Sequence, residues 1–201
     1  MVARHALSCV CTVLRVLCPA CGQSQASITV DFSDLTPGAQ CAFTCTIYCP
    51  VHFHALRQVY LDSERSYVQS LAYVHDWAAT GGASGATFFQ TEDERFVIKS
   101  LGRTEFVMFL KSALAYFRHM HDALLEDYYS MLVKILGVYK VVVNSGSKKN
   151  TKYLVVMENL FHGRQIPKHL IFDLKGKERR NRKATTGSQV RLDTDLFDYT
   201  R

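Results

Sequence analysis

A long stretch with helical periodicity stands between stretches that favour strands, and this alternation most constrains how the chain can fold. Over residues 104–121 the apolar side chains recur at helical spacing and share one face: Phe106, Phe109, Leu110, Ala113, Leu114, Phe117 and Met120. Thr104 is the predicted N-cap, and Glu105 lies in the first turn, where the helix dipole favours a carboxylate. Such a helix must bury its apolar face against another element.

The neighbouring segments can supply that surface, because their apolar residues alternate or cluster as in strands. Strands are predicted at 28–32, 41–48, 87–89, 95–99, 132–143, 153–157 and 171–174. The polar connector 144–151 indicates a hairpin, Pro50 ends a strand, and short helices are expected at 54–60 and 64–73. We therefore predict an α+β fold, in which an antiparallel sheet of about five or more strands packs on the helix.

Composition agrees with a globular protein. Hydrophobic residues make up 48% of the 201 residues and charged residues 21%, which excludes disordered and collagen-like chains. No uncharged apolar run reaches the roughly 18 residues that a membrane-spanning helix needs. The net charge of +6 is mild, so the placement of the basic residues matters more than their excess.

All seven cysteines lie in the first quarter of the chain. Their odd number argues against a secreted disulfide scaffold and indicates a reducing compartment. Cys18 and Cys21 have the C-x-x-C spacing of a zinc knuckle, but Cys9 and Cys11 are too close together for a usual ribbon. We prefer four unremarkable cysteines in an unstructured tail over 1–27. The apolar stretch 6–18 also faintly resembles a signal peptide, although a loose tail or a wrongly assigned start is the preferred interpretation.

Three elements in order predict a phosphate-binding site. The glycine-rich segment 81–85 allows backbone N–H groups to approach phosphate oxygens, and Ser84 adds a hydroxyl donor. Lys99 ends the second of the two predicted strands that follow this segment, and it offers a positive charge. Glu105, or another acid near the start of the following helix, could hold that lysine. The layout lacks a Walker motif and is that of kinase-like folds; the alternative is a surface turn followed by an unrelated lysine.

A basic run follows the motif Asp173-Leu174-Lys175-Gly176. Residues 175–183 hold one acid, Glu178, and six basic side chains: Lys175, Lys177, Arg179, Arg180, Arg182 and Lys183. Arginine density favours phosphate binding over a merely solvated loop. The absence of stacking aromatics counts against single-stranded nucleic acid.

These motifs, in this order, resemble the phosphatidylinositol phosphate kinases, and most closely the phosphatidylinositol 3-phosphate 5-kinase branch. The resemblance covers about 28–201 and rests on five short motifs: Gly81-Gly82-x-Ser84-Gly85, Phe96–Lys99, Lys134–Tyr139, Val156–Phe161 and Phe172–Gly176. Asn181-Arg182 also fits, as do the upstream residues Phe32–Asp34, Cys45, Tyr48, Phe53, Leu56-Arg57, Ser70-Leu71 and Trp77.

The resemblance implies ATP-dependent phosphorylation of an inositol-ring hydroxyl of a phosphoinositide. It implies an N-terminal lobe over 28–163 and the start of a C-terminal lobe over 164–201. ATP would be bound by Gly81, Gly82, Ser84, Gly85 and Lys99, with Glu105 supporting the lysine. Met157, Glu158 and Asn159 would lie at the hinge beside adenine, and Lys175 near the transferred phosphate. On charge alone, Lys177, Arg179, Arg180, Arg182 and Lys183 would face an acidic endosomal or other membrane surface, on which the protein would be peripheral.

The chain also departs from the family pattern. Lys177 stands where a serine follows Asp-Leu-Lys-Gly, and the spacing to Asn181-Arg182 is longer. The family's catalytic aspartate, metal-binding aspartate and lipid-selecting loop have no counterpart, since Asp193, Asp195 and Asp198 do not match them. Mg²⁺ is implied by the family, but its ligands would lie outside this chain, so we expect this polypeptide alone not to catalyse the transfer at a useful rate. A non-catalytic module that binds nucleotide or acidic membrane is the alternative, and nucleic-acid binding by the basic run is a third hypothesis.

A lobe that packs on a partner lobe should expose apolar surface when it is alone. We expect Phe161, Ile171, Phe172 or Leu196 to be less buried than their residue types suggest. We also expect poor order over 1–27 and 176–190, and strand or coil after 191.

Overall fold

The computed structural model describes residues 27–33, 41–77, 86–126, 129–145, 148–174, 176, 191 and 193–200. The chain divides into two compact units, one formed by 1–77 with 86–160 and the other by 78–85 with 161–201. The tail 1–26 with its four cysteines and the segment 177–190, for which the sequence predicted poor order, lie outside the described residues.

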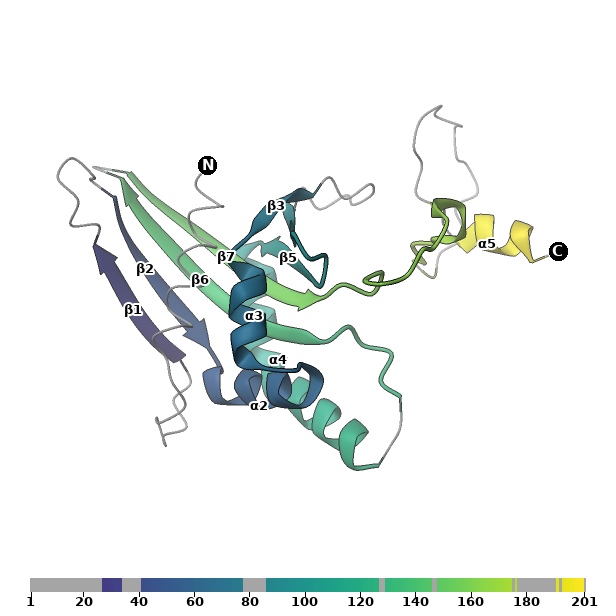
Figure 1. The fold of residues 1–201 in the computed structure, drawn as a ribbon, viewed down its shortest axis with the longest axis horizontal. Coiled ribbons are helices and arrows are strands. Elements are labelled where there is room, and N and C mark those ends of the chain that lie inside the picture. Colours follow the sequence, from purple (N-terminus) through teal and green to yellow (C-terminus); the bar gives the residue numbers. More distant parts are fainter. Residues whose placement is uncertain are drawn as a thin grey trace. The chain divides into compact units, whose positions relative to one another are not determined.

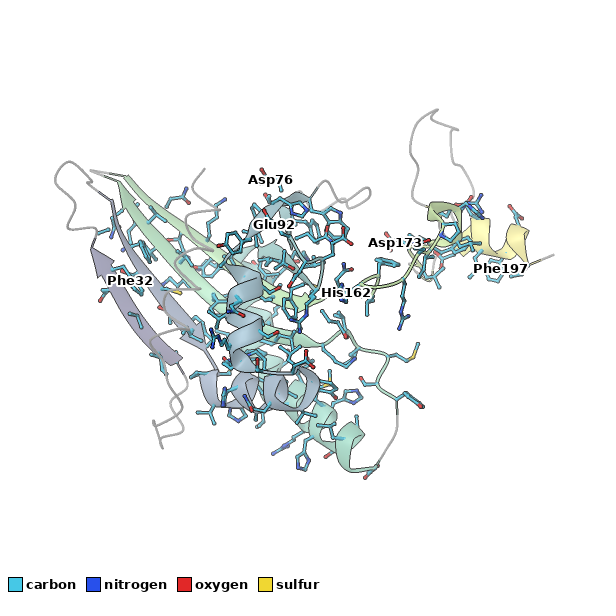
Figure 2. The ribbon with its side chains drawn as sticks, in the orientation of Figure 1. Phe32, Asp76, Glu92, His162, Asp173 and Phe197 are labelled. Carbon is cyan, nitrogen blue, oxygen red and sulfur yellow. The ribbon has the colours of Figure 1, made fainter. Side chains whose placement is uncertain are left out.

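The first unit is built on a seven-stranded antiparallel sheet, as the sequence predicted (Figure 1). Its strand order is β1-β2-β6-β7-β5-β4-β3. The strands are β1 (Ser27–Ser33), β2 (Cys41–Tyr48), β3 (Val74–Trp77), β4 (Phe88–Thr91), β5 (Phe96–Leu101), β6 (Ile135–Ser145) and β7 (Lys148–Glu158). The predicted hairpin is β6–β7, and both strands extend into the segment expected to be its connector. At the β1 edge, the rings of Phe32 and Phe43 stack with centroids 4.7 Å apart (Figure 2).

Three helices complete this unit and pack on both faces of the sheet. They are α2 (Pro50–Tyr60), α3 (Glu64–Leu71) and α4 (Arg103–Leu125). Tyr67 and Leu71 of α3 join one core cluster with Phe89, Ile98 and Val156 of the sheet. A second cluster lies on the other face and contains Phe53 and Leu56 of α2, Phe106 and Met120 of α4, and Val138 and Val155.

The strand register assigns Lys99 to the face that carries α4. Residues directly opposite one another point to the same side of a sheet. One such row runs across the whole sheet: Trp77, Phe88, Lys99, Val155, Val138, Tyr48 and Ser27. Val138 and Val155 belong to the α4 cluster, so the side chain of Lys99 lies on that face too.

Helix α4 corrects two sequence expectations. It begins at Arg103 after Gly102, so Thr104 is not the N-cap. Most of the predicted apolar face is buried or half-buried, but Leu114 is 57% exposed. Leu114 follows Ala113 by one residue, a rotation of about 100°, and this carries it off the stripe that Phe106, Ala113 and Met120 present to the sheet.

In the second unit, α5 (Asp193–Tyr199) replaces the strand or coil expected after 191. The first turn of this helix contains Asp193 and Asp195, which the helix dipole favours. The strand predicted at 171–174 is reduced to one parallel bridge between Phe172 and Arg191, beside a short 3₁₀ helix at Lys168–Leu170. A lone bridge forms because Asp173 N donates to Arg191 O at 2.7 Å and no longer ladder follows in the described residues.

The predicted exposure of apolar residues is confirmed. Phe161 is 39% exposed, and Ile171, Phe172 and Leu196 are only half-buried. Phe197 on α5 is exposed as well (Figure 2). Among the helices that the structure describes, none combines the length and the apolar character needed to cross a bilayer.

Candidate functional site

The predicted contact between Lys99 and Glu105 is present. Lys99 lies on β5 and Glu105 in the first turn of α4, and Nζ donates to Oε1 at 3.1 Å. The side chains are 24% and 48% exposed, respectively. The ammonium is therefore directed by a partner and still open to solvent on the α4 face of the sheet.

The turn between β5 and α4 explains why these two groups meet. Gly102 separates the strand from the helix, and its amide donates to Glu105 Oε2 at 2.8 Å. One carboxylate thus caps the helix with one oxygen and binds Lys99 with the other. The pKa of the Glu105 carboxyl lies below its ordinary value, first because of the Gly102 amide and then because of Lys99. The Glu105 carboxylate is therefore ionised at neutral pH.

The glycine-rich residues Gly81, Gly82, Ser84 and Gly85 lie outside the described residues, but the strands on either side are described. β3 and β4 pair with Trp77 opposite Phe88, and Phe88 in turn is opposite Lys99. Thr87 is tied to β5 twice, because its amide donates to Ser100 Oγ at 2.8 Å and its carbonyl accepts from Ser100 N at 2.9 Å. The strand that leaves the glycine-rich segment is thereby fixed beside Lys99.

The residues predicted for the hinge lie at the end of β7 and are held from two sides. Glu158 accepts from Lys134 three times: from the backbone N at 2.8 Å and from Nζ at 3.0 and 3.2 Å. Buried Asn159 donates through Nδ2 to Glu94 O at 2.7 Å and through its backbone N to Arg95 O at 2.9 Å. The side chains of Glu158 and Asn159 therefore fix the end of the strand.

Met157 has a different environment. It pairs with Val97 of β5 and packs against the core cluster on the α4 face. Since Val97 and Lys99 are two residues apart on one strand, Met157 and Lys99 lie on the same face of the sheet.

Sequence reasoning missed the role of Lys134. Its position in the motif Lys134–Tyr139 was noted, but no function was given to it. In the structure its ammonium also lies 5.2 Å from the centroid of the Tyr60 ring. The only signal in the sequence was that Lys134 and Glu158 have opposite charges. Since the two residues are 24 positions apart, their spacing does not predict that they pair.

The remaining predicted site residues fall outside the described residues: Lys175, Lys177, Arg179, Arg180, Arg182 and Lys183. In the described ranges, no group of three or more His, Cys, Asp or Glu side chains gathers to hold a metal ion. Asp173 belongs to the motif that precedes the basic run. Its backbone N donates to Arg191 O within the second unit.

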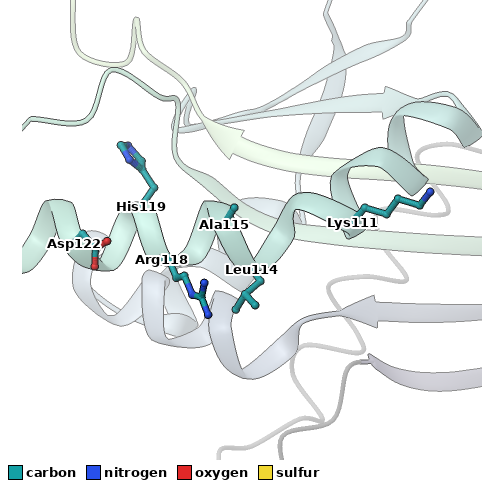
Figure 3. A pocket seen from close by; sticks show the side chains of 6 residues that line it. All are labelled: Lys111, Leu114, Ala115, Arg118, His119 and Asp122. Carbon is teal, nitrogen blue, oxygen red and sulfur yellow. The ribbon is translucent and has the colours of Figure 1, made fainter.

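The described part of the first unit has surface hollows on α3 and on α4 that contain no predicted site residue. One, of about 400 Å³, is lined by residues of α3 and the β4–β5 turn: Ser66, Gln69, Ser70, Tyr73, Glu92, Asp93 and Arg95. The other, of about 540 Å³, follows one side of α4 (Figure 3).

The arrangement around Lys99 can orient an anion. A compact ammonium held by a carboxylate from a helix start can attract and position phosphate oxygens. These described groups include no base poised on a nucleophile.

The chain matches the family profile described as Phosphatidylinositol-4-phosphate 5-Kinase over residues 72–199. It is 40% identical over 182 residues to the human 1-phosphatidylinositol 3-phosphate 5-kinase, which covers 87% of this chain and 8% of the relative. It is 35% identical over 161 residues to the Saccharomyces cerevisiae 1-phosphatidylinositol 3-phosphate 5-kinase FAB1, covering 78% of this chain and 7% of that protein. The chain thus spans less than a tenth of the length of these two relatives. The profile match extends over more than half of the residues, and the chain belongs to the phosphatidylinositol-4-phosphate 5-kinase family.

Proposed function

We propose that this chain forms the nucleotide-binding part of a phosphatidylinositol phosphate kinase of the 3-phosphate 5-kinase type. The observation that carries the proposal is the ion pair between Lys99 and Glu105 at 3.1 Å, on the sheet face that α4 covers. The relatives are named for transfer to phosphatidylinositol 3-phosphate. ATP is the cofactor that this family activity implies.

Lys99 would bind the phosphates of ATP, and the backbone amides of Gly81, Gly82 and Gly85 and the hydroxyl of Ser84 would donate hydrogen bonds to them. Because the Lys99 side chain is 24% exposed, phosphate oxygens can approach it while Glu105 fixes its direction. A nucleotide lying across β5 and β7 on this face would also meet Met157, which supports a place for adenine near the end of β7.

The basic run after Lys175 would contact the acidic membrane surface through Lys177, Arg179, Arg180, Arg182 and Lys183. Six basic side chains against one acid would attract an acidic membrane surface that contains the phosphoinositide. Lys175 would lie nearest the transferred phosphate. Mg²⁺, when bound, would neutralise charge on the phosphates.

The first experiment measures binding of a fluorescent ATP analogue to the full 201-residue chain. Lys99→Met should weaken binding about tenfold or more, since one charge-assisted contact is lost. Lys149→Ala, an exposed lysine on β7, is the matched control and should bind normally. Equal affinity in wild type and Lys99→Met, with both folded by circular dichroism, would contradict the proposal.

A second measurement separates the kinase from the alternative, a module that binds nucleotide or acidic membrane without transfer. Radiolabelled ATP is incubated with the chain and phosphatidylinositol 3-phosphate vesicles. We expect binding that depends on Lys99 and no useful transfer by this polypeptide alone. Robust transfer that Lys99→Met abolishes would overturn the expected inactivity and leave the site assignment intact.

A further inference from the structure

The outer side of α4 exposes apolar side chains. Met108 is 64% exposed, and Leu114 and Val107 are exposed too, whereas Met120 on the inner side is fully buried. A single exposed apolar residue would need no explanation. Three exposed apolar residues on the outer side of one helix, beside a surface hollow, indicate a binding surface.

The hollow on this side has the residue spacing of a helix-packing seam. Its lining residues all come from α4 at steps of three and four: Lys111, Leu114, Ala115, Arg118, His119 and Asp122 (Figure 3). Residues at this spacing form the ridges and grooves into which a second helix packs. Ala115 is small enough to admit a side chain beside it. We call these six residues the outer seam of α4.

The charge of the outer seam is mainly positive. Lys111 and Arg118 are seven residues apart, about 10.5 Å along the helix axis, with Leu114 between them. No ion pair joins either cation to a carboxylate within the part of the chain that the structure describes. Asp122 at the end of the seam accepts from His121 Nδ1 at 3.2 Å.

We propose that the outer seam of α4 binds an acidic amphipathic helix of a separate protein. Two carboxylates seven residues apart on that helix pair with Lys111 and Arg118, and an apolar side chain between them packs on Leu114. This is binding of a helix to a helical groove with charges that set its register. It goes beyond the proposed kinase activity and does not depend on it.

Two other occupants fit the seam less well. Juxtamembrane segments that recognise acidic lipid carry four to eight basic residues, and the seam has two with an aspartate beside them. A second copy of α4 packed on the seam would bring the same two cations together. Charge complementarity therefore favours an acidic protein helix.

The test uses labelled helical peptides of about 20 residues, with two glutamates seven apart and leucines between them, and a matched set with lysines in place of the glutamates. Fluorescence anisotropy with the full chain should show binding of the glutamate set only. The double variant Lys111→Glu with Arg118→Glu should lose about tenfold or more in affinity for the glutamate set and gain affinity for the lysine set. Leu114→Gln should weaken binding of the glutamate set, and its thermal melt should match that of wild type because Leu114 is exposed.

Three outcomes would overturn the proposal. One is that the chain binds the two peptide sets equally well, or that it binds neither set. Another is binding to acidic phospholipid vesicles, measured by cosedimentation, that the double variant loses while peptide binding stays absent. The third is a wild-type dimer in light scattering that the double variant converts to a monomer, which would assign the seam to a second copy.

Discussion

Two ion pairs of the first unit are built in opposite ways: one joins α2 to α3, and the other joins β5 to α4. Arg57 of α2 is 4% exposed and makes a forked contact with Glu64 of α3, from Nη2 to Oε1 at 2.6 Å and from Nε to Oε2 at 2.8 Å. Its Nη1 also donates to Leu136 O at 2.7 Å, and its guanidinium lies 4.7 Å from the centroid of the Tyr67 ring. The pair of Lys99 with Glu105 has a single contact, and its side chains are 24% and 48% exposed.

The difference separates a structural pair from one that can exchange partners. The donors of Arg57 are occupied by groups of the protein, so a ligand would have to displace them inside the core. The Lys99 ammonium has three N–H donors, and among the described residues it donates to one partner, Glu105. Phosphate oxygens can add to it without breaking the fold. Charge and spacing in the sequence do not distinguish the two cases, but burial does.

The largest effect should come from Arg57→Ala. Removing the guanidinium leaves the partly buried Glu64 with only the 3.3 Å contact to His54 Nδ1 and leaves Leu136 O without its Arg57 donor. This should lower the free energy of unfolding by about 3–5 kcal/mol. Urea unfolding followed by circular dichroism measures this. Arg65→Ala, an exposed arginine on α3, is the control and should stay within about 0.5 kcal/mol of wild type. If Arg57→Ala does not fold, Glu64→Gln provides a milder break; stability equal to wild type there would contradict the structural role.

A smaller effect is expected from Gly137→Ala at the irregularity of β6. A Cβ on Gly137 would lie 2.6 Å from Cε2 and 2.7 Å from Cζ of Tyr139. Tyr139 cannot move freely, because it is buried and its hydroxyl contacts that of Tyr67 at 3.1 Å. Overpacking of this kind costs about 1–3 kcal/mol.

A double-mutant cycle identifies the cause. In a Tyr139→Leu background the ring is gone, so adding Gly137→Ala should cost clearly less than it does in wild type. Equal costs in both backgrounds would show that the clash with Tyr139 is not the reason.

The smallest effect concerns Glu105 and appears as a pH dependence. Its pKa is lowered in the folded protein by the Gly102 amide and Lys99. The carboxylate therefore contributes stability in full above the unfolded value of 4.5 and loses it as the pH falls through the lower folded value. The stability difference between wild type and Glu105→Gln should be constant above about pH 5 and shrink below it. A difference that grows on acidification, measured by urea unfolding, would have the wrong sign.

The strand and helix order could be predicted because each element carries its own periodic pattern. The α+β class, the antiparallel sheet, the hairpin and the pair of Lys99 with Glu105 are all confirmed. The pair of Lys99 with Glu105 could be predicted because the two residues are six positions apart, one near the end of a strand and the other in the first turn of the next helix. The assigned ATP and lipid roles stay predictions.

Other features failed or were missed for identifiable reasons. Leu114 fits the apolar stripe by type but not by angle, and only packing on the sheet reveals which of two adjacent positions is inside. α5 was expected to be strand or coil, because a seven-residue helix holds too few turns to show a period. Lys134 and Glu158 pair across neighbouring strands, which spacing along the chain does not reveal.

By itself, the sequence determined the α+β class, most elements of the first unit, the family and the pairing of Lys99 in β5 with Glu105, since these depend on residue type and short spacing. Tertiary structure alone decided which charged groups are free to meet a ligand. Arg57 and Lys99 are both cations with a glutamate nearby in sequence, yet one is enclosed between α2, α3 and β6 and the other faces solvent. Burial is a sum over residues from distant parts of the chain, and no local pattern contains that sum.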